Sequence, residues 1–238
     1  IQFTPDLMPS DVLGTTVFNM KTNEFDFHRG PVFADMILVD EINRAPAKTQ
    51  SALFEVMEER QVSIDGTTYQ MGELYTILAT QNPVEQEGTY KLPEAQLDRF
   101  LMKITMDYPS LEEEVDILER HHTNAALVKL EDVRAVITRD ELLTLRRLMD
   151  RVFVDRTLLQ YIALIVQQTR TSKAVYLGAS PRASVAMLQS SKAYALLQGR
   201  DFVTPEDIKF VAPYVLQHRL ILTAEAPGSA ISGLPPYR

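Results

Sequence analysis

The sequence contains no cysteine, and this absence excludes several kinds of site. Disulfides, thiol nucleophiles and zinc–thiolate centres all require cysteine. A chain without cysteine suits a reducing compartment, so we expect a cytoplasmic protein. The sequence also lacks an apolar run close to the roughly 20 residues that span a bilayer, and it has no basic, apolar signal peptide. We therefore expect no membrane span.

Positive charge is also scarce, because 24 Lys and Arg residues stand against 32 Asp and Glu residues, for a formal net charge of −8. Nucleic-acid binding needs clustered Lys and Arg to neutralise phosphates, and no such cluster occurs. Nucleic acid is therefore not an expected partner. With 238 residues and 45% hydrophobic content, the chain is long enough for one large or two modest domains.

The first part of the chain, as far as about Pro109, alternates between strand and helix patterns, which is typical of an α/β sheet. The run at 36–39 has four apolar residues without alternation and predicts a parallel strand buried on both faces. Further strands are predicted at 75–83 and 101–109. The remaining patterns predict helices at 47–60 and 93–100, and hairpins at 16–27 and 61–71.

The pattern changes after Pro109, where helical periodicity continues without a convincing strand. Helices are predicted at 112–122, 139–152, 156–171, 180–198 and 204–217. Two of them have clear starts, because Ser180 and Thr204 each place a capping hydroxyl before a proline. We therefore expect a core domain at 1–109, an all-helical domain at 110–225 and a C-terminal tail at 226–238.

Two adjacent carboxylates, Asp40 and Glu41, follow the apolar strand at 36–39. Such an Asp-Glu pair can simply end a strand, because acidic residues are depleted within sheets. However, ligands bind at the carboxyl ends of parallel strands, and the strand at 75–83 ends nearby in Thr80-Gln81-Asn82. A carboxylate for magnesium, a second carboxylate for water and an adjacent amide together suggest nucleotide hydrolysis.

Longer segments resemble the MoxR family of AAA+ ATPases, in the clade that carries an insert in helix 2. The matching segments are "FTPDLMPSDVLGT" at 3–15, "GPVFADMILVDEINRAPAKTQSALFEVMEERQVSIDG" at 30–66, "ATQNPVEQEGTYKLPEAQLDRF" at 79–100 and "GASPRA" at 178–183. The resemblance implies a P-loop NTPase-type parallel sheet followed by an all-helical lid. It also implies that the two hairpins face a pore or a partner. The alternative is that they only extend the sheet and have no such role.

The resemblance also implies a role for each site residue, with ATP and Mg²⁺ as cofactors. Asp40 would be the Walker B aspartate that holds magnesium, and Glu41 the catalytic glutamate. Asn82 would be sensor 1, Arg99 an arginine finger that reaches the neighbouring subunit, and Arg182 the sensor 2 arginine. The alternatives are a surface ion pair with Asp98 or Glu94 for Arg99, and a solvated arginine in a first helical turn for Arg182.

One departure from the family pattern concerns the phosphate-binding loop GxxxxGK[ST]. None of the nine glycines precedes a lysine, although that loop needs both. Because the family places the loop before the strand that begins at Ile1, we expect an N-terminal part of roughly 70 to 110 residues to be absent from this chain. By the resemblance, the strand that leads to this loop would lie between the strands at 75–83 and 101–109. Because the loop that binds the phosphates is missing, we expect this chain alone to be inactive.

The function implied by the resemblance is ATP hydrolysis that drives chaperone-like remodelling or maturation of partner proteins. The working form would be a homo-oligomeric ring, expected to be hexameric, and partners with von Willebrand A domains are implied. A non-hydrolysing, ring-forming assembly module is the alternative. A DNA-handling AAA+ protein fits the acidic balance less well.

Overall fold

The computed structural model describes residues 1–82, 90–123 and 130–223. The chain divides into two units, Ile1–Leu101 and Met102–Arg238, and each has its own hydrophobic core. The tail expected at 226–238 lies outside the described residues. Within the described ranges, no helix combines the length and the apolar character that crossing a membrane requires.

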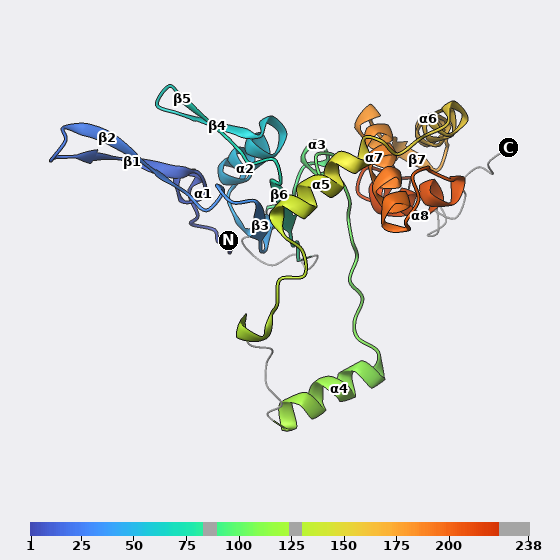
Figure 1. Cartoon of the computed structure of the whole chain (residues 1–238), viewed down its shortest axis with the longest axis horizontal. Coiled ribbons are helices and arrows are strands. Elements are labelled where there is room, and N and C mark those ends of the chain that lie inside the picture. The colour runs from blue at the N-terminus through green and yellow to red at the C-terminus, as the bar shows by residue number, and fades with distance from the viewer. Residues whose placement is uncertain (83–89, 124–129, 224–238) are drawn as a thin grey trace. The chain divides into compact units, whose positions relative to one another are not determined.

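The first unit contains strands and helices in alternation (Figure 1). In chain order they are α1 (Pro9–Leu13), β1 (Gly14–Asn19), β2 (Glu24–Arg29), β3 (Met36–Val39), the 3₁₀ turn η1 (Ile42–Arg44), α2 (Ala47–Glu59), β4 (Gln61–Ile64), β5 (Thr67–Gln70), β6 (Thr76–Ala79) and α3 (Glu94–Leu97). The predicted helix at 47–60 and both predicted hairpins are confirmed, since β1 pairs with β2 and β4 with β5.

The strands that carry the predicted site form a small parallel sheet. β3 and β6 pair in parallel from Met36↔Thr76 to Val39↔Ala79. On the other side of β3 the chain start runs parallel to it, because Asp40 N donates to the Ile1 carbonyl at 2.8 Å and Phe3 N donates to the Asp40 carbonyl at 2.9 Å. The other edge of β6 has no partner strand among the described residues. The α/β fold class with a parallel sheet is confirmed.

The prediction that the strand at 36–39 is buried on both faces was wrong. Ile37 and Val39 are 4% and 0% exposed and belong to the first unit's core, whereas Met36 and Leu38 are 63% and 57% exposed. The buried face shares this core with α2 residues such as Phe54. The two outward side chains stay accessible because none of the described segments buries them.

The two hairpins of the first unit contact each other through side chains. Thr16 Oγ1 donates to Asp65 Oδ2 at 2.6 Å, and the rings of Phe27 and Tyr69 lie 4.7 Å apart. Asp65 and Gly66 have φ values of 49° and 79°, so the predicted Asp-Gly turn has the left-handed backbone that tight hairpins need.

The second unit is built mainly from helices. Its elements are α4 (Leu111–His122), the 3₁₀ turn η2 (Leu130–Asp132), α5 (Arg139–Met149), α6 (Arg156–Thr171), β7 (Val175–Leu177), α7 (Pro181–Leu197), α8 (Pro205–Leu216) and β8 (Ile221–Leu222). All five predicted helices are present. The expectation of an all-helical domain was wrong in one respect, because β7 and β8 pair antiparallel where the chain leaves α6 and α8.

The strand predicted at 101–109 does not form, and its backbone is hydrogen-bonded in a different way. Lys103 N donates to the Tyr214 carbonyl of α8 at 2.9 Å, and the Gln217 side-chain amide donates to the Lys103 carbonyl. The segment therefore runs along the end of α8 instead of joining a sheet. Ile104 and Met106 are 73% and 90% exposed, so these two apolar side chains of the predicted strand are not buried.

Candidate active site

Asp40 and Thr80 lie side by side at the carboxyl ends of β3 and β6. The Thr80 hydroxyl donates a hydrogen bond to Asp40 Oδ1 and accepts one from the backbone N–H of Glu41 at 2.9 Å. Backbone hydrogen bonds hold the two strands in register at this point, since Thr80 N donates to the Val39 carbonyl at 2.9 Å. The prediction that these strand ends are neighbours is therefore confirmed.

Glu41 leaves the strand geometry immediately after Asp40. Its φ and ψ are 52° and 51°, a left-handed conformation that is uncommon for residues other than glycine. Two donors hold one oxygen of the carboxylate, because Gln2 Nε2 donates to its Oε2 at 2.9 Å and Arg44 Nη1 pairs with the same oxygen at 2.9 Å. The backbone turn, and not strand alternation, therefore sets the direction of Glu41.

Asn82 joins this group through its backbone. The side-chain amide of Asn43 donates to the Asn82 carbonyl at 3.2 Å, and the Asn43 carbonyl accepts from the Tyr90 N–H at 2.6 Å. The Asn82 residue itself is exposed. The structure thus places Asp40, Glu41 and Asn82 at one end of the parallel pair.

The donor set at this sheet end fits a magnesium–nucleotide complex. Mg²⁺ prefers oxygen ligands and is bound by one or two carboxylates together with phosphates and water. Asp40 supplies a partly exposed carboxylate beside the Thr80 hydroxyl, and Glu41 supplies a second one. Among the described residues no group of three or more His, Cys, Asp or Glu side chains could hold a metal. One carboxylate beside a hydroxyl fits what Mg²⁺ takes from a protein when phosphate and water supply the other oxygens.

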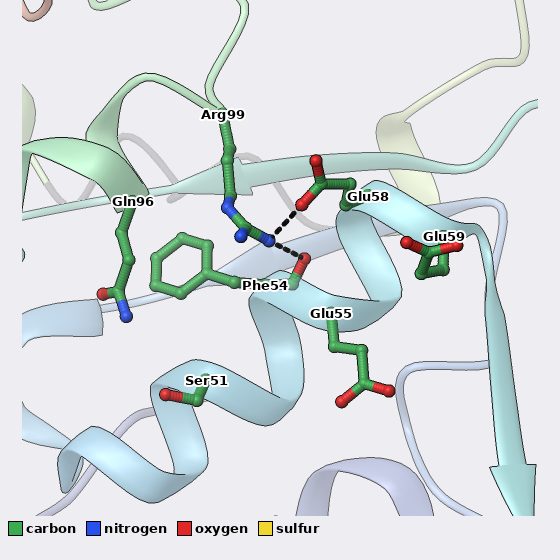
Figure 2. Close-up of a pocket in the computed structure, with 7 residues that line it drawn as sticks. All are labelled: Ser51, Phe54, Glu55, Glu58, Glu59, Gln96 and Arg99. Atoms are coloured by element: carbon green, nitrogen blue, oxygen red, sulfur yellow. Dashed lines mark hydrogen bonds and ion pairs between the residues drawn. The ribbon is translucent and has the colours of Figure 1, made fainter.

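Arg99 lies against α2 (Figure 2). Its Nη1 pairs with Glu58 Oε2 at 2.5 Å and donates to the Phe54 carbonyl at 3.3 Å. Arg99 and Glu58 line a pocket of about 280 Å³. The other lining residues are Ser51, Phe54, Glu55, Glu59 and Gln96. The ion-pair alternative proposed for Arg99 named Asp98 or Glu94, and the structure shows an ion pair with Glu58 of α2.

Arg182 lies in the second unit, at the second position of α7. Its backbone N–H donates to the Ser180 hydroxyl at 3.1 Å, which confirms Ser180 as the cap of this helix. An arginine near the positive end of a helix dipole gains nothing from that dipole. The helix dipole therefore does not favour an arginine at this position.

Several contacting residues were not anticipated from the sequence. They are Gln2, Arg44 and Thr80 around the carboxylates, Asn43 beside Asn82, and Glu58 beside Arg99. Thr80 could have been found, because it directly precedes the Gln81-Asn82 pair at the same strand end. The other four contacts depend on backbone turns and side-chain directions that residue spacing does not specify.

Comparisons with known proteins agree with this arrangement. Residues 1–102 match the family model described as ATPase family associated with various cellular activities (AAA), and residues 167–233 match the AAA lid domain. The crystal structure of a candidate ATPase from Cytophaga hutchinsonii superimposes with a TM-score of 0.84 at 43% identity, covering 94% of this chain and 70% of that one.

Two relatives are similar along almost the whole chain. An uncharacterised protein of Bacillus subtilis, YeaC, is 50% identical over 95% of this chain and 70% of its own length. Chaperone MoxR1 of Mycobacterium tuberculosis is 46% identical over 98% of this chain, which spans 63% of that protein. With the Asp40–Glu41 strand end and the helical second unit, these similarities show that the chain belongs to the MoxR family of AAA+ ATPases.

Proposed function

We propose that the full-length gene product hydrolyses ATP at the carboxyl end of β3 and β6. In this proposal Asp40 holds Mg²⁺, Glu41 orients and polarises the attacking water, and Asn82 contacts that water or a phosphate oxygen. Bound magnesium would neutralise charge that develops on the phosphates during transfer. The observation that carries the proposal is the Asp40–Thr80–Glu41 cluster.

The contacts of the two carboxylates support a division of roles. Asp40 accepts the Thr80 hydrogen bond on Oδ1. A metal ligand that is oriented by a neighbouring hydroxyl would have this arrangement. Glu41 lies between the Gln2 amide and the Arg44 guanidinium, which keep its carboxylate in one direction. A carboxylate positioned in this way is suited to act on water from a fixed distance.

The two arginines complete the proposal. Arg99 acts as an arginine finger on the nucleotide of a neighbouring subunit in a ring, expected to be a hexamer, and Arg182 reaches the phosphates from the lid. Guanidinium groups suit both roles because they stay charged and bind phosphate oxygens in pairs. The family membership supports this assignment.

The work done with this hydrolysis is chaperone-like remodelling or maturation of partner proteins in the cytoplasm, and proteins with von Willebrand A domains are candidate partners. The name of one relative, Chaperone MoxR1, supports this part of the proposal. A measurement of ATP hydrolysis distinguishes this proposal from the alternative of a ring-forming module without enzymatic activity.

The test is ATP hydrolysis by full-length protein carrying Glu41→Gln. The amide keeps the shape of the glutamate but does not polarise water, so we expect ATP binding to persist while turnover falls by ~10²-fold or more. Turnover at the wild-type rate would remove Glu41 from the mechanism. Absence of hydrolysis in the wild-type protein, with rings still formed, would favour the assembly module.

A further inference from the structure

The hydrogen bonds between β3 and β6 continue beyond the strands, but their donor changes. The Ile42 N–H donates to the Thr80 carbonyl at 3.0 Å. Because η1 turns the chain away after Glu41, the next carbonyl of the β6 chain, that of Asn82, is met by the side chain of Asn43 at 3.2 Å. A side-chain amide therefore takes the place of a backbone donor where the strand has ended.

The burial of Asn43 indicates why an amide is needed here. The residue is 5% exposed, and its Oδ1 has no hydrogen-bond partner among the described residues. A buried acceptor without a partner lowers stability, whereas an apolar side chain of the same size would avoid that cost. The polar atom that makes a contact is the Nδ2 donor, which bonds to Asn82.

We propose that Asn43 is a positioning residue that sets the place of Asn82 relative to Glu41. Asn43 lies two residues after Glu41 in the same turn, so one short segment holds both the glutamate and the carbonyl of Asn82. The backbone carbonyl of Asn43 also accepts from the Tyr90 N–H, which adds a second hydrogen bond between this turn and a later part of the chain. This inference rests on the proposed ATPase function and on the role proposed for Asn82.

The test compares full-length Asn43→Leu with wild type in steady-state ATP hydrolysis, equilibrium binding of a fluorescent non-hydrolysable ATP analogue, and thermal unfolding. Leucine has nearly the shape of asparagine but lacks both the donor and the unpaired acceptor. We expect kcat to fall by ~10-fold or more, because small misplacements of catalytic groups cost up to about 10²-fold. KM for ATP, analogue binding and Tm should stay close to wild type.

Thr49→Val is the matched control. Thr49 is also buried and its hydroxyl donates to the Leu7 carbonyl at 2.6 Å, away from the strand ends, so its loss should leave kcat unchanged. A wild-type kcat for Asn43→Leu would overturn the inference. If Asn43→Leu instead lowers kcat, analogue binding and Tm together, the kcat values of Asn43→Gln and Asn43→Met are compared. These two side chains match in length, and only glutamine has an amide donor.

A higher kcat for Asn43→Gln than for Asn43→Met supports the inference, and equal values overturn it. Glu41→Gln and Asn82→Ala are measured in parallel. If both hydrolyse ATP at the wild-type rate, the proposed function fails. If both are impaired while Asn43→Leu is normal, only the role of Asn43 fails.

Discussion

Replacement of Glu58 by alanine tests how Arg99 is made available to a neighbouring subunit. Arg99 is bound on its own subunit by Glu58 and by the Phe54 carbonyl, and the adjoining pocket also contains Glu55 and Glu59 (Figure 2). Three carboxylates repel a polyphosphate, so in its proposed role Arg99 would have to leave Glu58 before it binds one. Glu58 would then compete with phosphate for the guanidinium group.

The exposure of the pair limits the size of this effect. The side chains of Arg99 and Glu58 are 31% and 33% exposed, and ion pairs with such access to water contribute ~0–1 kcal/mol. That range corresponds to at most about a 5-fold change in the population of released Arg99. We therefore expect Glu58→Ala to raise turnover by up to about 5-fold, whereas Arg99→Ala should lower it on the order of 10³-fold.

The assay is steady-state ATP hydrolysis by full-length protein at a concentration where rings form. Glu55→Ala is the matched control, because it removes a carboxylate from the same helix and pocket, whereas the ion pair of Arg99 is with Glu58. Mixing Arg99→Ala with Glu41→Gln protein should restore some activity at mixed interfaces if Arg99 acts in trans. A loss in Glu58→Ala as large as that in Arg99→Ala would refute the reasoning, because Glu58 would then be required to position Arg99.

Two further predictions concern Thr80 and Asp207. Thr80→Val removes the hydroxyl that bonds both Asp40 and the Glu41 N–H, so we expect a ~10-fold or greater loss of turnover that Thr80→Ser restores, measured by ATP hydrolysis against Mg²⁺ concentration. Burial alone would raise the pKa of Asp207, but hydrogen bonds from Arg200 and Thr204 outweigh it and hold the pKa below its usual range. The carboxylate therefore stabilises the fold above the unfolded pKa of about 3.9, and this contribution is lost as the pH falls through the lower native pKa. Asp207 accepts from the Thr204 N–H at the start of α8, and loss of this cap in Asp207→Ala should lower the free energy of unfolding by about 1 kcal/mol. The variant should also reduce the acid dependence of Tm in thermal unfolding, and an unchanged acid dependence would contradict the assignment.

The elements that could be predicted from the sequence are those with a local signal. Asp65-Gly66 between alternating segments predicted the β4–β5 hairpin, and Ser180-Pro181 predicted the start of α7. The backbone preferences that act at these positions belong to the residues themselves. Such signals therefore hold whatever the rest of the chain does.

The elements that could not be predicted depend on distant partners. Residues 101–109 have the composition of a strand, but a strand needs a neighbour, and Lys103 bonds to Tyr214 and Gln217 instead. The exposed face of β3 has a similar cause, because an apolar run indicates that burial is possible and not which element provides it. Met36 and Leu38 show this difference directly.

The same limit explains why the sequence placed the two carboxylates at a strand end but did not give the direction of each side chain. Strand alternation would direct Asp40 and Glu41 to opposite faces only if both were in the strand. In the structure β3 ends at Val39. Asp40 still pairs with the chain start and bonds to Thr80, whereas Glu41 takes a left-handed backbone. A left-handed glutamate costs about 1–2 kcal/mol, which its contacts with Gln2 and Arg44 help to offset. The backbone change between two adjacent carboxylates thus places one beside a hydroxyl, where a metal ligand is suited, and the other between two donors that fix its direction.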